Sequence, residues 1–461
     1  MLPELRTEIP GPESRRLSAE LRRYESRNVT FVSDEFPVFW ERAEGVNVWD
    51  VDGNRFLDLT SAFAVASLGH NPPAVVEAMR AQSGRLIHAM GDVHPTREKV
   101  ELCRLLSDIT FERWGLGAGR TILTNSGSEA VEAALKTALL HSGKPGVISF
   151  TGGYHGLGHG ALETGGIPFF REPFRAQLGR FGVQIPYPSC HRCPFGCRDG
   201  FRLAGRHFPN CSSACLTEIR DRIETVLRQR EIGAILVEPV QGRGGEVVPP
   251  RDFLRLLREI CDAHKVLLVL DEIYTGFHRT GRLFACEHFD VAPDLICVGK
   301  ALTSGFPLSA CVGRREVMDA WPESAGEALH TSTFLGNPVG CTMAVASIRE
   351  HLRPETEILA REASHMLDEE LAKLRAPAIG DVRGVGLMRG IELVRADGSP
   401  DAALAGAMVT RALREGILLL AGSPNGNVLS LTPPFAISRE EITFALGRVQ
   451  EYATSLPGSI S

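Results

Sequence analysis

The chain has 461 residues, a formal net charge of −6, 43% hydrophobic residues and 23% charged residues. This composition is typical of a globular protein, and the length allows about three domains of ~150 residues each. It excludes intrinsic disorder and collagen-like repeats, and the slightly acidic balance provides no basic field that would favour nucleic acid or an anionic membrane as a partner.

No segment has the character of a targeting signal or a membrane span. The N-terminus lacks the basic start and apolar stretch of a secretory signal, and apolar runs such as 266–270 are much shorter than the ~20 residues that cross a bilayer. We therefore expect a cytoplasmic protein without a membrane partner. In that compartment, cysteines in ordinary stretches are expected to be buried, reduced thiols. These are Cys103, Cys261, Cys286, Cys297, Cys311 and Cys341.

The two flanks of the chain differ from its middle. Residues 47–53 alternate in polarity and end in an Asp-Gly pair, which predicts a hairpin within residues ~30–75. From about Cys341 onward the pattern predicts long helices and short strands, with a last helix near 439–454. We expect a small domain made from residues 1–75 and 336–461, around a large domain of residues 76–335.

Short apolar runs alternate with helical segments in the middle of the chain. Helical periodicity covers residues 129–140 and 252–264. Strand, helix and strand at this spacing predict a mostly parallel sheet covered by helices, with ligands bound beyond the carboxyl ends of its strands. The runs expected to be strands buried on both faces are residues 121–124, 146–150, 234–237, 266–270 and 295–298.

Three features with chemical potential follow these predicted strands. Residues 125–129 form a small-residue turn before a helix, where free backbone N–H groups and the helix dipole make a natural phosphate site. Asp271 follows a buried run, where a carboxylate is costly unless it meets a cation. Lys300 follows another such run, and a desolvated lysine amine loses its proton readily and can form a Schiff base.

Each feature alone also has an ordinary structural explanation. Asn125 or Ser126 can serve as a plain helix N-cap, Asp271 can form a salt bridge or cap the next helix, and Lys300 can be a surface lysine. Together, at one edge of one sheet, they suit pyridoxal phosphate. This cofactor needs an imine-forming lysine, an acid for its pyridine nitrogen and a phosphate cradle.

Motifs in a fixed order make the chain resemble the class III aminotransferases over roughly residues 35–450. The resemblance implies pyridoxal phosphate as cofactor and the α/β fold type I of PLP-dependent transferases, which is aspartate-aminotransferase-like. In that fold a large domain has a mostly parallel central sheet, and a smaller α+β domain comes from both chain ends. The matching segments are Trp49–Gly53, Leu68–His70, Asn125–Ala130, Gly153–Gly156, Val237–Gly242, Leu270–Gly276, Gly299–Ala301 and His330–Pro338.

The resemblance also implies roles for single residues. Lys300 would hold the cofactor and, once displaced by substrate, act as general base, while Asp271 would pair with the pyridine nitrogen. The other expected cofactor-binding residues are Ser126, Gly127 and Ser128 around the phosphate, Tyr154 and Ile273 on the two ring faces, His155 and Glu238 lining the site, and Thr333 of the partner subunit at the phosphate. The enzyme would therefore be a homodimer with shared active sites.

Four positions depart from the commonest family pattern. Tyr274 stands where many members have Gln, and Leu157 stands where the γ-aminobutyrate-type enzymes have an Arg. Their second carboxylate-binding Arg aligns with Ser430, and a Glu that often neutralises it aligns with Arg243. Arg243 could thus receive an anionic group of the substrate, or the substrate could lack a carboxylate beside its amine, as in an amino sugar. The alternative is that Arg243 bridges to a local acid, Glu246 or Asp252.

Cysteines cluster within an insertion at residues 186–216. Two close pairs with two histidines nearby resemble a zinc ligand set, but their spacing matches no standard ribbon or finger and one cysteine is left over. A structural metal, one or two disulfides and free thiols all stay open, and no metal is assigned to the active site. The cluster consists of Cys190, Cys193, Cys197, Cys211 and Cys215, with His191 and His207.

The leading functional hypothesis is an aminotransferase that moves an amino group between a small-molecule amine donor and a carbonyl acceptor. An amino-acid racemase, epimerase or aminomutase on the same fold is the closest alternative, because it would share Lys300 and Asp271. A metal-binding interaction module would explain only the cysteine cluster. A nicotinamide dehydrogenase is disfavoured, because no Gly-x-Gly-x-x-Gly turn follows a predicted strand.

Overall fold

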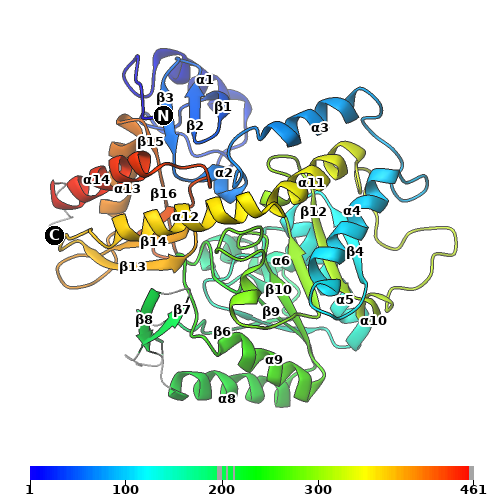
Figure 1. Ribbon diagram of the computed structural model, residues 1–461. Coiled ribbons are helices and arrows are strands. Elements are labelled where there is room, and N and C mark those ends of the chain that lie inside the picture. The colour runs from blue at the N-terminus through cyan, green and yellow to red at the C-terminus, as the bar shows by residue number, and fades with distance from the viewer. Residues whose placement is uncertain (190, 195–199, 204–205, 211–212, 456–461) are drawn as a thin grey trace.

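The computed structural model describes residues 1–189, 191–194, 200–203, 206–210 and 213–455. Its elements form two regions that lie side by side (Figure 1). The larger region contains a seven-stranded sheet, and the smaller one contains two four-stranded sheets.

The central sheet has the strand order β4-β12-β11-β10-β9-β5-β6. Among the described strands of this sheet only β12 runs against its neighbours, pairing antiparallel with both β11 and β4. The expected α/β fold with a mostly parallel sheet is therefore confirmed. The strands are β4 (Gly119–Thr124), β12 (Ser309–Arg314), β11 (Leu295–Val298), β10 (Leu267–Asp271), β9 (Ile232–Val237), β5 (Gly146–Phe150) and β6 (Gly182–Ile185).

The five strands predicted from apolar runs are all present, with ends shifted by at most two residues, whereas β6 and β12 were not predicted. The predicted helices correspond to α5 (Gly127–Ser142) and α9 (Phe253–His264). The remaining helices of this region are α3 (Pro73–Ser83), α4 (Arg97–Ser107), α6 (His159–Thr164), α7 (Pro168–Arg171), α8 (Ser213–Gln229), α10 (Arg315–Met318) and α11 (Pro338–His351).

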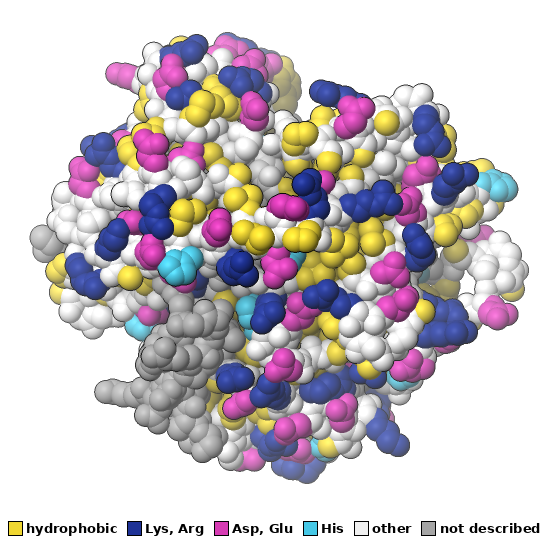
Figure 2. Space-filling view, in the orientation of Figure 1, with side chains coloured by type: hydrophobic (Ala, Val, Ile, Leu, Met, Phe, Trp, Pro, Cys, Tyr) yellow, Lys and Arg dark blue, Asp and Glu magenta, His cyan; other side chains and the backbone are white. Residues whose placement is uncertain are grey.

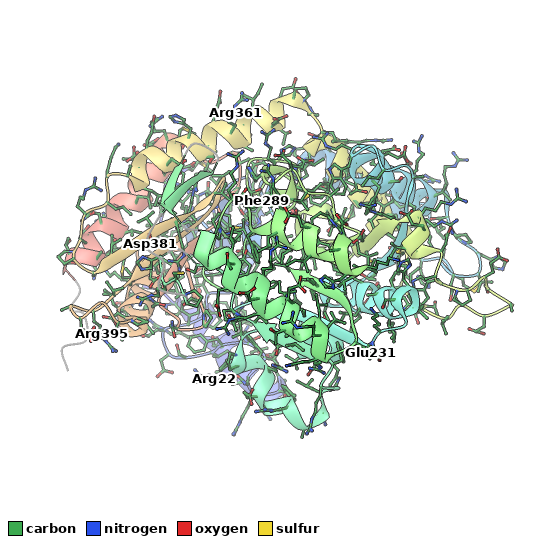
Figure 3. All side chains as sticks on the ribbon, turned by 90° about the horizontal axis from the view of Figure 1, so that it is seen from below. Arg22, Glu231, Phe289, Arg361, Asp381 and Arg395 are labelled. Carbon is green, nitrogen blue, oxygen red and sulfur yellow. The ribbon has the colours of Figure 1, made fainter. Side chains whose placement is uncertain are left out.

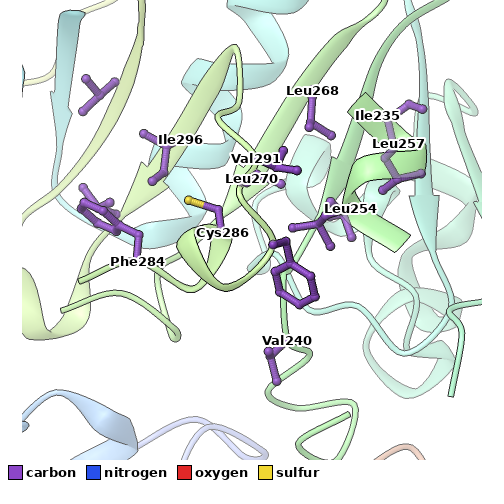
Figure 4. Packing of buried hydrophobic residues seen from close by; sticks show 14 of the residues in the cluster. Ile235, Val240, Leu254, Leu257, Leu268, Leu270, Phe284, Cys286, Val291 and Ile296 are labelled. Carbon is purple, nitrogen blue, oxygen red and sulfur yellow. The ribbon is translucent and has the colours of Figure 1, made fainter. Parts of the chain in front are cut away.

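Alternate residues of the central strands pack on opposite faces of the sheet. On β10, Leu268 and Leu270 join the cluster with α9, which Figure 4 shows in part, while Leu267 and Val269 join the cluster with α5. Because side chains alternate along a strand, the next residue, Asp271, faces the α5 side. The sheet thus carries this carboxylate to the start of α5.

The smaller region joins the two ends of the chain. β3 (Arg55–Asp58) pairs in parallel with β15 (Ile417–Leu418), and the predicted hairpin is formed by β2 (Asn47–Asp50) and β3. This confirms a small region built from both chain ends, while the boundaries at residues 75 and 335 stay a prediction. The other elements are β1 (Trp40–Glu44), β13 (Ile379–Val385), β14 (Met388–Leu393), β16 (Leu420–Gly422), β17 (Val428–Leu431), α1 (Pro12–Tyr24), α2 (Ser61–Ala64), α12 (Pro354–Leu371), α13 (Ala402–Arg414) and α14 (Arg439–Ser455).

One buried arginine connects the two regions. Arg279, on the loop after β10, donates hydrogen bonds to the carbonyl oxygens of Leu387 (3.1 Å) and Pro433 (2.7 Å) and to Ser67 Oγ (2.9 Å). Its side chain is 0% exposed. Burial lowers the pKa of Arg279 to about 10, since its hydrogen-bond acceptors are uncharged.

The surface carries both signs of charge. Figure 2 shows Lys and Arg interspersed with Asp and Glu over one face. Of the residues labelled in Figure 3, Arg22, Glu231 and Arg395 are exposed, whereas Phe289 is buried. Within the described residues, no helix combines the length and the apolar character that a membrane crossing requires. The cytoplasmic location stays a prediction.

Candidate active site

The carboxyl ends of parallel strands bring the predicted residues together. Leu270 pairs with Val237, and Asp271 pairs with Cys297, so Asp271 and Glu238 end neighbouring strands at the same edge of the sheet. Lys300 lies three residues after Cys297, just beyond the end of β11. Glu272 is fully buried and accepts the backbone N–H groups of Ala285 and Cys286, so it anchors a loop rather than lining the site.

A cavity of about 520 Å³ opens at this edge, a volume suited to a small cofactor and its substrate. It contains every predicted site residue except Thr333, which lies on an exposed loop of this chain. The lining consists of Phe63, Ser126, Gly127, Ser128, Tyr154, His155, Gly156, Leu157, Glu238, Arg243, Asp271, Ile273, Tyr274 and Lys300.

The start of α5 offers an anion site at one end of the cavity. Ser126 is the N-cap, and its Oγ accepts the N–H of Glu129 at 3.3 Å. The N–H groups of Gly127 and Ser128 precede the first complete helical turn and have no intrahelical acceptor. A Cβ at Gly127 would lie 2.8 Å from Ile273 Cδ1, so glycine allows Ile273 to pack against the turn. The turn is an N-cap, and its unpaired N–H groups at Gly127 and Ser128 are suited to an anion.

Asp271 is held by His155. His155 Nδ1 lies 2.8 Å from Asp271 Oδ2, and both side chains are buried. Burial opposes a charge on His155, but the hydrogen bond and the charge of Asp271 outweigh it and raise the pKa of the imidazole. The hydrogen bond therefore orients the carboxylate of Asp271 at the cavity.

Glu238 joins two loops beneath the site. Its carboxylate oxygens accept the N–H groups of Tyr154 and Gly242, both at 2.9 Å. Burial raises its pKa, against the opposing effect of His155. Glu238 thereby fixes the loop that carries Tyr154 and His155.

Lys300 lies on the cavity wall in a strained backbone conformation. Its φ of 47° is in the left-handed region, which a side chain other than glycine rarely adopts without a structural or functional constraint. Its Nζ is 4.8 Å from the centroid of the Tyr274 ring. Burial lowers the pKa of the amine, and the carboxylates of Asp271 and Glu238 offset part of this effect. The amine is therefore easier to deprotonate than a surface lysine.

Two lining residues, Phe63 and Gly156, were not predicted as site residues. Phe63 belongs to α2, a single left-handed turn in which all four residues have φ between 45° and 64°. None of the four is Gly or Asn, so no sequence signal marks the turn. Gly156 has φ 111°, and a Cβ there would lie 2.4 Å from Ser128 Cβ; its place in the Gly153–Gly156 motif was the available signal.

The alternative, an ion pair of Arg243 with Glu246 or Asp252, is not formed within the residues that the structure describes. Glu246 accepts the hydroxyl of Ser430 at 2.5 Å, and Asp252 lies 3.6 Å from Arg255. The two acids proposed as partners of Arg243 are thus engaged elsewhere.

The cysteine cluster lies partly outside the described residues, which do not include Cys190, Cys197 and Cys211. Cys193 is a free thiol and Cys215 is buried, and within the described part of the chain no group of three His, Cys, Asp or Glu side chains could hold a metal ion. The question of metal, disulfide or free thiol stays open. Of the six other cysteines, five are buried and Cys103 is half-buried, all of them free.

The donor set fits pyridoxal phosphate. A helix N-terminus without side-chain bulk at Gly127, a carboxyl group oriented by His155 at Asp271 and a strained, desolvated amine at Lys300 meet in one cavity. On this fold, these features define a PLP-dependent enzyme of fold type I.

Comparison with known proteins gives the family. The family model for class III aminotransferases matches residues 30–452, and the chain belongs to this family. It is 36% identical over 444 residues to a 4-aminobutyrate aminotransferase of Mycobacterium leprae, covering 95% of each chain. It is also 34% identical over 421 residues to a leucine/methionine racemase of Thermococcus litoralis, covering 90% of each.

A solved structure agrees with the fold. An amine transaminase from an uncultivated Pseudomonas species, determined with PLP bound, superimposes with a TM-score of 0.82 at 29% identity. The alignment covers 93% of this chain and 98% of that one. The protein is therefore a PLP-dependent transaminase in class and fold.

Proposed function

We propose that the enzyme transfers an amino group from a small primary amine to a carbonyl acceptor, with Lys300 as the residue that moves the proton. The observation that carries this proposal is that Lys300 and Asp271, from neighbouring strand ends, line one cavity beside the α5 N-terminus. When bound, pyridoxal phosphate supplies an aldehyde that condenses with amines and a pyridine ring that withdraws electrons.

The residues of the chain divide the remaining work. Lys300 Nζ would attach to the cofactor and then, released by the substrate amine, take the proton from the substrate carbon and return it. Asp271, oriented by His155, would accept the N–H of the pyridine ring. The amides of Gly127 and Ser128 would hold the phosphate, with Ser126 as their cap, and Tyr154 and Ile273 would bound the two ring faces.

The proposal includes a homodimer that completes each site. The segments that carry Ile87 and Phe334 lie side by side, since Asn337 Nδ2 donates to the carbonyl of Ile87 (2.9 Å) and the rings of His88 and Phe334 are 5.4 Å apart. Asn125 Nδ2 donates to Ser332 Oγ at 2.9 Å, which links this loop to the start of α5. In the proposed dimer, Thr333 of the partner subunit would reach the phosphate across the surface formed by the segments that carry Ile87 and Phe334.

The test compares Lys300→Ala with Lys136→Ala, an exposed lysine of α5. We expect Lys300→Ala to lose the visible absorbance of the PLP-loaded protein after gel filtration and to lose all turnover, while Lys136→Ala keeps both. Wild-type protein that shows no such absorbance after incubation with pyridoxal phosphate would contradict the proposal.

A second measurement separates transfer from isomerisation. The similarity to a leucine/methionine racemase is the observation that supports isomerisation as the second candidate function. With an amine donor alone in deuterated water, an aminotransferase releases about one carbonyl product per active site and then stops. Exchange of the α-hydrogen without carbonyl product would favour the racemase or epimerase instead.

A further inference from the structure

Arg243 is placed at the cavity by two aromatic rings. Its guanidinium carbon lies 5.2 Å from the centroid of the Tyr154 ring and 5.1 Å from that of Phe170. Tyr154 and Phe170 also contact each other edge to face, at 5.4 Å between centroids. Cation–π contacts of this kind hold the flat guanidinium in place while leaving its N–H edges available.

No carboxylate forms an ion pair with this guanidinium within 4 Å in the described parts of the chain, and Glu246 acts on it only from a longer distance. Glu246 is buried and bonded to Ser430, and Asp252 is near Arg255. Arg243 is exposed and lines the cavity. A guanidinium can bind a carboxylate through two parallel N–H···O hydrogen bonds. A guanidinium at a cavity that forms no ion pair among the described residues can therefore receive an anion.

The rest of the described lining offers no competing receptor for a substrate anion. Besides Arg243, its only basic side chain of Lys or Arg type is Lys300, which the proposed function assigns to the amine chemistry. Leu157 is apolar, and Ser430 sits on β17 with its hydroxyl directed to Glu246. The positive charge of Arg243 also contributes to the lowered pKa of Lys300, which shows that the two cations share one electrostatic environment.

We propose that Arg243 binds the carboxylate of the substrate, so that the enzyme acts on amino acids and their keto-acid partners in preference to amino sugars or simple amines. This inference rests on the proposed amino transfer. It assigns carboxylate recognition to a residue on the loop after β9, held by Tyr154 and Phe170.

The experiment uses the PLP-loaded enzyme and donors that differ only in the carboxylate: alanine against ethylamine, and 4-aminobutyrate against propylamine. For the wild type we expect a KM at least tenfold lower for the carboxylate member of one pair. Arg243→Gln should raise the KM for that amino acid at least tenfold more than the KM for its plain amine, and Arg243→Lys should restore part of the difference. The exposed Arg251, outside the cavity lining, provides the control Arg251→Gln.

A binding measurement gives a readout without turnover. Calorimetric titration of the loaded enzyme with butyrate, which carries no amine, should show at least tenfold weaker binding in Arg243→Gln than in the wild type or Arg251→Gln. Equal KM ratios and equal butyrate affinities in Arg243→Gln and wild type would overturn the inference. Wild-type enzyme that reacts with neither member of either pair, nor with any other amine tested, would instead overturn the proposed function.

Discussion

Glu246 is a buried acid that makes the stability of this protein depend on pH. It is 3% exposed, its Oε1 accepts the Ser430 hydroxyl, and its Oε2 has no hydrogen-bond partner. Burial raises its pKa from 4.5 to about 8. Because the folded pKa lies above the unfolded one, the folded state is favoured most below about pH 4.5, and stability is lost as pH rises through about 8.

Glu246→Gln should remove this loss, because an amide does not ionise. We expect the melting temperature of the variant, relative to wild type, to rise by at least about 2 °C between pH 5 and pH 9. Thermal unfolding followed by circular dichroism at both pH values measures the difference. The exposed Glu231 (Figure 3) supplies the control Glu231→Gln, and a pH-independent difference for Glu246→Gln would contradict the prediction.

Single site residues could be predicted from the sequence where a charged side chain follows a buried strand. Asp271 and Lys300 stand out because charged residues are rare at such positions, whereas Glu238 was expected only from the family resemblance. The contacts of Arg243 could not be predicted, since its two aromatic neighbours come from segments distant in the sequence. Phe63 could not be predicted either, because its left-handed turn contains only residues that normally avoid that conformation.

Two helical glycines differ in what surrounds them. Gly447 of α14 is exposed, and a Cβ there would meet nothing within 4 Å, whereas a Cβ at Gly340 of α11 would lie 2.9 Å from Phe306 Cδ1. Gly447→Ala should therefore stabilise the protein by about 0.5–1 kcal/mol through backbone entropy.

Gly340→Ala should destabilise the protein by about 1–3 kcal/mol through overpacking. Denaturant unfolding of both variants checks the pair of predictions. A loss of stability in Gly447→Ala, or a gain in Gly340→Ala, would be inconsistent with the packing described.

Strands of the central sheet were predicted from the sequence where they form continuous apolar runs. β12 reads Ser-Ala-Cys-Val-Gly-Arg, with small residues that allow close packing against α5 but give a weak apolar signal. β6 is a short edge strand whose residues are mostly half-buried, so its pattern also lacks the continuous apolar run of a central strand.

At the scale of the whole molecule, exposed apolar residues support the proposed homodimer. Ile87 is 66% exposed and Phe334 59% exposed, and Leu329, Val93 and Met90 are exposed on the same two segments. Exposed apolar residues on two neighbouring segments favour an interface between subunits.

Phe334→Asp should convert the proposed dimer to monomers at micromolar concentration and reduce turnover at least tenfold, because each site would lose Thr333 of the partner subunit. Light scattering after size-exclusion chromatography measures the mass. Ile358→Asp, on exposed α12, should stay dimeric and active. A monomeric wild type would contradict the prediction.

The hydrogen bonds of Arg279 couple the unfolding of the two regions. One guanidinium is shared by the loop after β10, by Ser67 near the start of the chain, and by Leu387 and Pro433 near its end. Separating the two regions would break all three hydrogen bonds together, while a partial loosening that kept the guanidinium buried would leave it without acceptors. We therefore expect heat to melt both regions in one calorimetric transition.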